Sequence, residues 1–178
     1  MRVHRIIIVF LMLTIGEAHA QGKTYNLGRA PTSDEVQVWD IAINPDGMEL
    51  REGNGSAKDG APVYARKCIA CHGNKAVGAA APALVGRNTV VANWPFATSL
   101  WDYINRAMPL NMEGSLSNNE VYAITAYLLY VGSVIDESYM LNRDNLPNVK
   151  MPNSAGYVQP PIDQWEPGMP RLFRIIDP

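Results

Sequence analysis

An apolar pattern with helical spacing is the clearest feature of the chain, and it begins just after residue 117. Its members recur every three or four residues, as on one face of a helix; they are Val121, Ile124, Leu128, Val131 and Ile135. Directly before them, Ser117 and Glu120 match a capping box, in which each side chain accepts a hydrogen bond from the other residue's backbone N–H. The pattern predicts a helix that begins behind Ser117 and buries this face.

Two shorter helices are predicted earlier in the chain. Ser56 is a candidate N-cap for the first, which leads through residues 60–67 to Cys68. The second opens at residues 99–102, and four of its residues can share one face: Leu100, Tyr103, Ile104 and Ala107. No comparable stretch alternates with the period of two that is typical of a strand. The pattern therefore predicts an all-α fold.

Turns and prolines mark the flanks of this helical zone. Residues 21–55 contain a capping box at Thr32 and Glu35, which opens a short helix, and a strong turn with the sequence Asn-Pro-Asp-Gly at 44–47. Residues 137–178 are rich in proline, which excludes a long helix and favours an extended segment laid over a surface. We therefore expect a helical domain over residues 56–136 between two extended, proline-rich flanks.

The N-terminus has the pattern of a secretory signal. Arg2 and Arg5 precede the short apolar run 6–13, and Ala18-His19-Ala20 provides small residues at a cleavage site. We expect residues 1–20 to be removed and the mature protein to lie in the periplasm, without a membrane span. An uncleaved N-terminal anchor is the alternative, but the apolar run is short for a span.

Composition limits the partners of the chain. The 178 residues carry a formal net charge of −2, which becomes −3 when the signal segment is removed. A mildly acidic chain without a basic stripe is not typical of proteins that bind nucleic acid. The length is that of a single domain.

Residues 68–72, with the sequence Cys-Ile-Ala-Cys-His, carry the strongest chemical signal. Two thiols three positions apart can each add to a vinyl group of one porphyrin, and the histidine behind them can bind its iron. We therefore predict one covalently attached haem c, held by Cys68 and Cys71 with His72 as an iron ligand.

Other uses of the two cysteines explain the pattern less well. A thioredoxin-like pair needs a βαβ context, which is absent around this motif. A zinc site needs further Cys or His ligands, but the remaining histidines are His4 and His19 and there is no third cysteine. A disulfide at this spacing would constrain almost nothing.

The second axial ligand has to come from another residue type. Removal of the signal segment leaves His72 as the only histidine, and methionine is the soft, neutral ligand that suits electron transfer. We favour Met108, because Pro109 ends the preceding helix and restricts the backbone at Met108. Met112 is the second candidate. Met151-Pro152 repeats the dipeptide but lies in the proline-rich flank.

The helical zone resembles a class I c-type cytochrome. Residues 81–87, Ala-Pro-Ala-Leu-Val-Gly-Arg, are similar to the family's segment behind the proximal histidine, which implies that the Pro82 carbonyl accepts the outer N–H of His72. The resemblance also implies that Arg87 pairs with a haem propionate, and that Gly60 and Tyr64 meet Tyr127 and Leu128 where the first and last helices cross. Asn93, Trp94 and Trp101 are weaker propionate candidates, and for the tryptophans core packing is the better prediction.

A closer resemblance extends beyond the haem domain. Residues 93–109 and 120–129 are similar to the SoxD-type cytochromes of sulfur-compound oxidation, and so are the flank segments 27–29 and 146–152. This resemblance implies a redox partner, a molybdenum sulfite or sulfane dehydrogenase. The longer members of that family carry two haem motifs and this chain has one, which favours a one-haem subunit or a separable carrier.

Together these features predict an electron-transfer protein rather than an enzyme. With His72 and Met108 on both axial positions, the haem would accept single electrons from a partner and pass them to a downstream cytochrome or oxidase. Three alternatives remain: a general carrier to a terminal oxidase, an open-iron enzyme such as a peroxidase-like protein, and a chiefly structural subunit that anchors a catalytic partner.

Overall fold

The computed structural model describes residues 28–158, which form parts of two compact units, and the boundary between the units in the sequence falls between Asp40 and Ile41. The expected signal segment 1–20 lies outside the described residues. In the first unit, helix α2 spans Ser33–Trp39. Its predicted capping box is confirmed: the Thr32 hydroxyl accepts from the backbone N–H of Glu35, whose carboxylate accepts from the N–H of Thr32.

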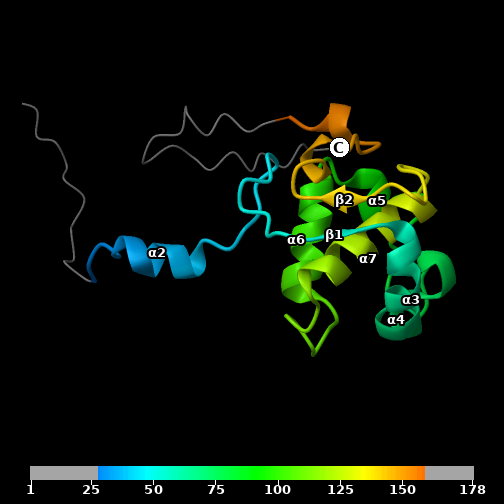
Figure 1. Ribbon diagram of the computed structural model, residues 1–178, viewed down its shortest axis with the longest axis horizontal. Coiled ribbons are helices and arrows are strands. Elements are labelled where there is room, and N and C mark those ends of the chain that lie inside the picture. Colours follow the sequence, from blue (N-terminus) through cyan, green and yellow to red (C-terminus); the bar gives the residue numbers. More distant parts are fainter. Residues whose placement is uncertain (1–27, 159–178) are drawn as a thin grey trace, which may run out of the picture. The chain divides into compact units, whose positions relative to one another are not determined.

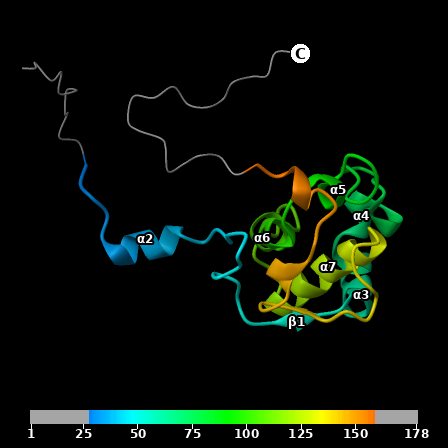
Figure 2. The same ribbon diagram turned by 90° about the horizontal axis from the view of Figure 1, so that it is seen from above.

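Helix α7 is the centre of the second unit, with α3 on one side and α6 on the other (Figures 1 and 2). The helices are α3 (Ala57–Lys67), α4 (Ile69–His72), α5 (Val90–Asn93), α6 (Ala97–Ala107) and α7 (Asn118–Val131). Short 3-10 turns occur at η1 (Asn74–Ala76), η2 (Leu146–Asn148) and η3 (Ser154–Gly156). The fold is therefore mostly helical, as predicted. Within residues 28–158, no helix has the length and apolar character needed to cross a bilayer.

The helix starts follow the predicted caps closely. Ser56 with Asp59 begins α3, and Ser117 with Glu120 begins α7, each as a full capping box. Helix α6 begins two residues before the predicted Ser99, behind Phe96, which makes no side-chain cap. Because Thr98 and Ala97 are buried in the core, packing rather than a cap determines where this helix begins.

Helix α7 ends at Val131, so the predicted continuation of its face to Ile135 is wrong. Ser133 has a φ of +59°, and the N–H of Val134 bonds back to the carbonyl of Leu129 at 2.8 Å. This is a Schellman-type end, in which a left-handed residue turns the chain away from the helix axis. Ile135 still packs against the core, because the turn returns it to the same side.

The tightest contact in the fold is the crossing of α3 and α7. A Cβ added at Gly60 would lie 1.9 Å from the carbonyl oxygen of Ala123 and 2.9 Å from the Cβ of Tyr127. One turn along each helix, the rings of Tyr64 and Tyr127 pack with centroids 4.8 Å apart. The close crossing that the family resemblance implied is therefore present, and only glycine fits at position 60.

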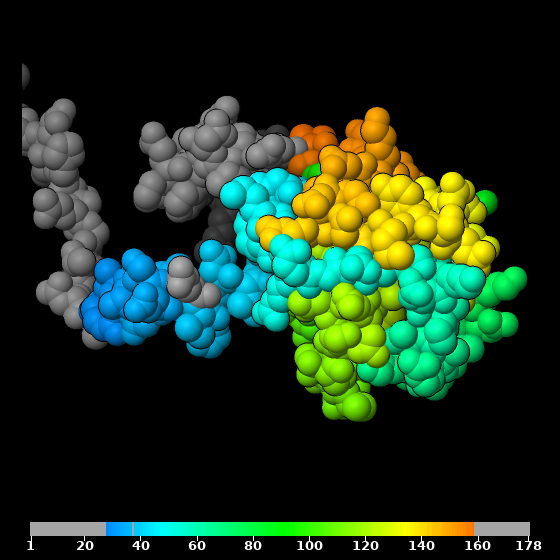
Figure 3. Space-filling model, in the orientation of Figure 1, coloured from blue at the N-terminus to red at the C-terminus, as the bar shows by residue number. Residues whose placement is uncertain are grey.

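Both flanks contribute side chains to the core. Leu50 precedes strand β1 (Asn54–Gly55), which pairs antiparallel with β2 (Leu141–Asn142). Buried side chains from the C-terminal flank follow, namely Leu141, Leu146 and Met151. Figure 3 shows the two flank segments side by side over the helices. The second unit thus includes residues 41–55 and 137–158 and not the helical zone alone.

We predict that Gly60→Ala lowers the free energy of unfolding of the protein by about 2 kcal/mol or more. Alanine would favour an isolated helix by roughly 1 kcal/mol, so a loss must come from the clash with Ala123. Lys58→Ala, at an exposed position of the same helix, should change stability by less than about 0.5 kcal/mol. Guanidinium unfolding followed by circular dichroism measures both. A Gly60→Ala protein as stable as the wild type would refute the close crossing.

The acidic caps predict a loss of stability in acid. Hydrogen bonds from the Ser56 hydroxyl lower the pKa of Asp59, and the backbone N–H of Ser117 lowers the pKa of Glu120. Each cap therefore stabilises fully above the unfolded-state pKa of about 4 and is lost as pH falls through the lower folded value. The stability difference between wild type and Asp59→Asn/Glu120→Gln should shrink between pH 6 and pH 3. A difference that stays constant over that range would contradict this account.

Candidate haem site

The Cys-x-x-Cys-His motif lies where helix α3 breaks into α4. Cys68 is the C-cap of α3, and its backbone N–H donates a hydrogen bond to the carbonyl of Tyr64. Its φ of −125° departs from helical geometry and interrupts the helix. One further turn, α4, carries Cys71 and His72. Both cysteines are free thiols; Cys68 is half-buried and Cys71 exposed. The two sulfurs and the imidazole therefore come from one short stretch of backbone.

The ring of His72 is held by a backbone oxygen. Its Nδ1 lies 2.9 Å from the carbonyl oxygen of Pro82, the contact that the family resemblance implied. Since a carbonyl only accepts hydrogen bonds, Nδ1 carries the proton, and the lone pair of Nε2 is left for a metal. A ring orientation fixed in this way is typical of metal-binding histidines.

The chemistry of Cys68 argues against a thioredoxin-like pair. Burial raises the pKa of this thiol to about 11, and the neighbouring Cys71 adds to the effect while Lys67 opposes it. Redox-active Cys-x-x-Cys pairs have a lowered pKa, because the thiolate is the nucleophile. Cys68 therefore lacks the lowered pKa that a redox-active thiol of this motif needs.

Met108 is placed at the end of α6, as the Met-Pro dipeptide predicted. It is the C-cap residue with extended backbone, its N–H bonds to the carbonyl of Ile104, and its side chain is half-buried against the core. Helix α4 and the 108–117 loop both lie at the lower end of the domain in Figure 1. The sulfur is thus partly sheltered but not enclosed by the core.

The other candidate methionines differ in exposure. Met112 is 62% exposed in the loop that follows α6, whereas Met151 is 2% exposed and belongs to the core. Met48 and Met140 are exposed, and Met169 lies outside the described residues. A buried core sulfur has no room for a metal, which argues against Met151. Of the exposed or half-buried methionines among residues 28–158, Met108 and Met112 are the two that lie where α6 ends.

Exposed apolar side chains lie in the same segments as His72 and Met108. Five large ones are at least 37% exposed: Ile69, Val77, Tyr103, Leu110 and Met112. Apolar surface of this kind marks a site that another group covers. A porphyrin face is flat and apolar. A haem bound through His72 and Met108 would therefore cover these exposed apolar side chains.

The predicted propionate partners differ in their surroundings. Arg87 is exposed and makes no hydrogen bond to another described residue, and the carbonyl of Asn93 accepts from Asn153. The ring of Trp94 packs edge-on against Tyr103, and Trp101 is fully buried against Tyr122, as core packing predicts.

Two polar atoms on α6 lack a partner. Nε1 of Trp101 and Oγ1 of Thr98 are buried without a hydrogen bond to any described residue. A water molecule or a carboxylate that is not part of the protein would satisfy them.

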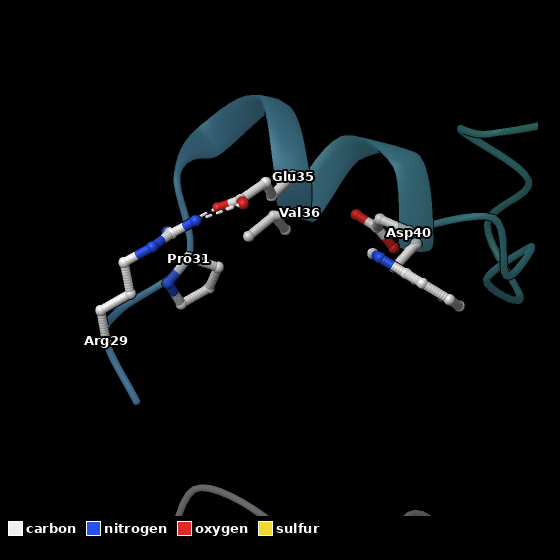
Figure 4. Close-up of a pocket in the computed structure, with 6 residues that line it drawn as sticks. Arg29, Pro31, Glu35, Val36 and Asp40 are labelled. Carbon is white, nitrogen blue, oxygen red and sulfur yellow. Dashed lines mark hydrogen bonds and ion pairs between the residues drawn. The ribbon is translucent and has the colours of Figure 1, made fainter. Parts of the chain in front are cut away.

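A hollow lies on the unit that contains α2, far along the sequence from the motif (Figure 4). It is open to solvent and lined by Arg29, Pro31, Glu35, Val36, Trp39 and Asp40. Trp39 is 84% exposed and Val38 70% exposed. The sequence gives the cap of this helix but no signal that its apolar residues remain uncovered.

Known proteins match different lengths of the chain. The family model of subunit III of the cbb3-type cytochrome c oxidase matches residues 55–128. Among solved structures, the chain is similar to a chain of the sulfane dehydrogenase SoxCD of Paracoccus pantotrophus, with 34% identity and a TM-score of 0.66. That match covers 79% of this chain and 75% of the other. Comparison with curated protein sequences gives no significant match.

The two matches agree with the site. The family model includes the motif at 68–72, the histidine held by Pro82 and the Met108 cap, and the solved structure shares the fold over most of the chain. The chain therefore belongs to the class I c-type cytochromes, a family of haem electron carriers, and is related to the SoxD-type cytochromes.

Proposed function

We propose that the mature chain is a periplasmic cytochrome that transfers single electrons through one covalently attached haem c. The hydrogen bond between His72 and Pro82 carries this proposal, because it places the ring proton on Nδ1 and leaves Nε2 free to bind a metal. Cys68 and Cys71 would hold the porphyrin, and Arg87 one of its propionates. The bound iron would supply a centre that alternates between two oxidation states.

Met108 is proposed as the second axial ligand. Its half-buried side chain at the end of α6 is supported by the core, whereas Met112 extends from an exposed loop. A thioether is a soft, neutral ligand that raises the reduction potential of a haem. With both axial positions filled, no substrate would bind iron, and the chain would act as a carrier rather than as an enzyme.

The electron donor is proposed to be a molybdenum sulfite or sulfane dehydrogenase. The similarity to a chain of SoxCD covers 79% of this chain and so extends beyond residues 55–128, which match the general cytochrome family model. The exposed Trp39 and Val38 on α2 provide apolar surface for contact with such a partner. A downstream cytochrome or an oxidase would then accept the electron.

Two other functions make different demands on the site. A general carrier to a terminal oxidase would use the same haem but would not need a partner bound at Val38 and Trp39 of α2. A peroxidase-like enzyme needs an open iron with an acid–base group beside it, and His72 is the only histidine among residues 28–158. Ligation at Met108 and attachment to a partner therefore distinguish the three functions.

Met108→Ala tests the axial ligand. We expect the midpoint potential to fall by on the order of 0.1 V, within the roughly 0.8 V range over which axial ligands set haem potentials. The reduced variant should also bind carbon monoxide at neutral pH, which the six-coordinate wild type resists. Met112→Ala, in the exposed part of the same loop, should match the wild type in both measurements. An unchanged potential in Met108→Ala would transfer the role to Met112, and carbon monoxide binding by the wild type would favour the open-iron enzyme.

Co-purification tests the partner. Tagged protein isolated from the periplasm should recover molybdenum in proportion to haem. Loss of an exposed aromatic anchor typically weakens an interface by more than 1 kcal/mol, so Trp39→Ser should lower this recovery by roughly tenfold. Met48→Ser, a similarly exposed residue of the second unit, is the matched control. Haem without molybdenum in the wild-type preparation would favour the general carrier.

A further inference from the structure

The loop between His72 and Pro82 has an unusual backbone. Gly73 and Gly78 have φ values of +75° and +97°, which glycine adopts readily. Lys75 and Ala76 also have positive φ, +53° and +60°, a region that side chains with a Cβ disfavour. A loop of this kind persists only when its surroundings hold it in place.

The hydroxyl of Tyr64 is one such contact. This residue lies on α3, is 1% exposed, and donates a hydrogen bond of 3.0 Å to the carbonyl oxygen of Gly73. Burial is the main reason that the pKa of Tyr64 is raised to about 12, so the hydroxyl keeps its proton and remains a donor. Its ring is fixed by Tyr127 at the crossing of α3 and α7.

The loop in turn bonds to the haem motif along its length. The N–H of Gly78 donates to the carbonyl of His72 and the N–H of Ala81 to the carbonyl of Cys71, each at 2.8 Å. The next residue is Pro82, whose carbonyl accepts from Nδ1 of His72. The backbone of the loop therefore joins two sets of hydrogen bonds, the one from the Tyr64 hydroxyl at Gly73 and those that hold Gly78, Ala81 and Pro82 against the haem motif.

We propose that the Tyr64 hydroxyl is a positioning group for the proximal histidine. By holding Gly73, it keeps the 73–82 loop in the conformation that presents the Pro82 carbonyl to His72. Tyr64 acts through the loop and does not itself bind the imidazole. The inference rests on the proposed function, in which His72 binds iron. The strength of the His72–Pro82 hydrogen bond then sets how much electron density the imidazole donates, and thereby the reduction potential.

Two matched variants of one aromatic pair test the proposal. Tyr64→Phe keeps the ring packing and removes only the hydroxyl that bonds to Gly73. Tyr127→Phe removes the hydroxyl of the opposite ring, which makes no hydrogen bond to a described residue. The measurements are solvent exchange of the His72 ring N–H by NMR of the reduced haem protein, the midpoint potential, and stability to guanidinium.

We expect the His72 ring N–H to exchange roughly five- to tenfold faster in Tyr64→Phe, the change expected for loss of one hydrogen bond. Its midpoint potential should rise, because a weaker hydrogen bond leaves the imidazole a poorer donor to ferric iron. Tyr127→Phe should match the wild type in both readouts.

Ring N–H exchange and potential unchanged in Tyr64→Phe would overturn the inference, even if stability falls, since the hydroxyl would then only support the fold. A wild-type chain without the spectrum of a covalently bound, low-spin haem would overturn the proposed function and this inference together. The wild-type spectrum thus separates the two failures.

Discussion

The close crossing of α3 and α7 at Gly60 and Ala123 is the constraint on which the rest of the second unit depends. It fixes the C-terminal end of α3, where Cys68 and α4 follow directly, and it places α7 in the middle of the core. Nearly all side chains from Val121 to Leu129 are buried, because α3, α6 and both flanks pack around this helix. A bulkier residue at position 60 would separate the two helices and displace the motif that α3 carries.

The proposed iron ligands lie where helices end rather than within them. His72 is in the single turn after the break at Cys68, and Met108 is the residue that closes α6 ahead of Pro109. Beyond such ends the chain is free to take loop conformations, and the loop after His72 brings the Pro82 carbonyl to its Nδ1. The rigid helices thus set the positions of the two ends, and local hydrogen bonds set the orientation of the imidazole.

Local signals in the sequence predicted the helices well and the edges of the unit less well. Ser56, Ser117 and Thr32 each marked a helix start, because a capping box involves only neighbouring residues. The start of α6 at Ala97 and the end of α7 at Val131 depend on packing and on a left-handed Ser133, which apolar spacing does not encode. The two-residue pairing of β1 and β2 is too short to produce a period-two pattern. The motif and the Pro82 contact were expected because residues 68–72 and 81–87 match a family pattern.

The two Met-Pro dipeptides show why local sequence alone does not identify a ligand. Met108 and Met151 have the same neighbour, yet one is half-buried at the end of α6 and the other is 2% exposed within the core.

Tertiary packing also decides which of the two flanks belongs to the domain. Leu141, Leu146 and Met151 complete the core of the second unit, so residues 137–158 are part of the domain and not an arm free to bind a partner. Residues 28–40 belong to a separate unit in which Val38 and Trp39 are exposed, so this flank, and not residues 137–158, carries the apolar surface on which the proposed partner contact rests.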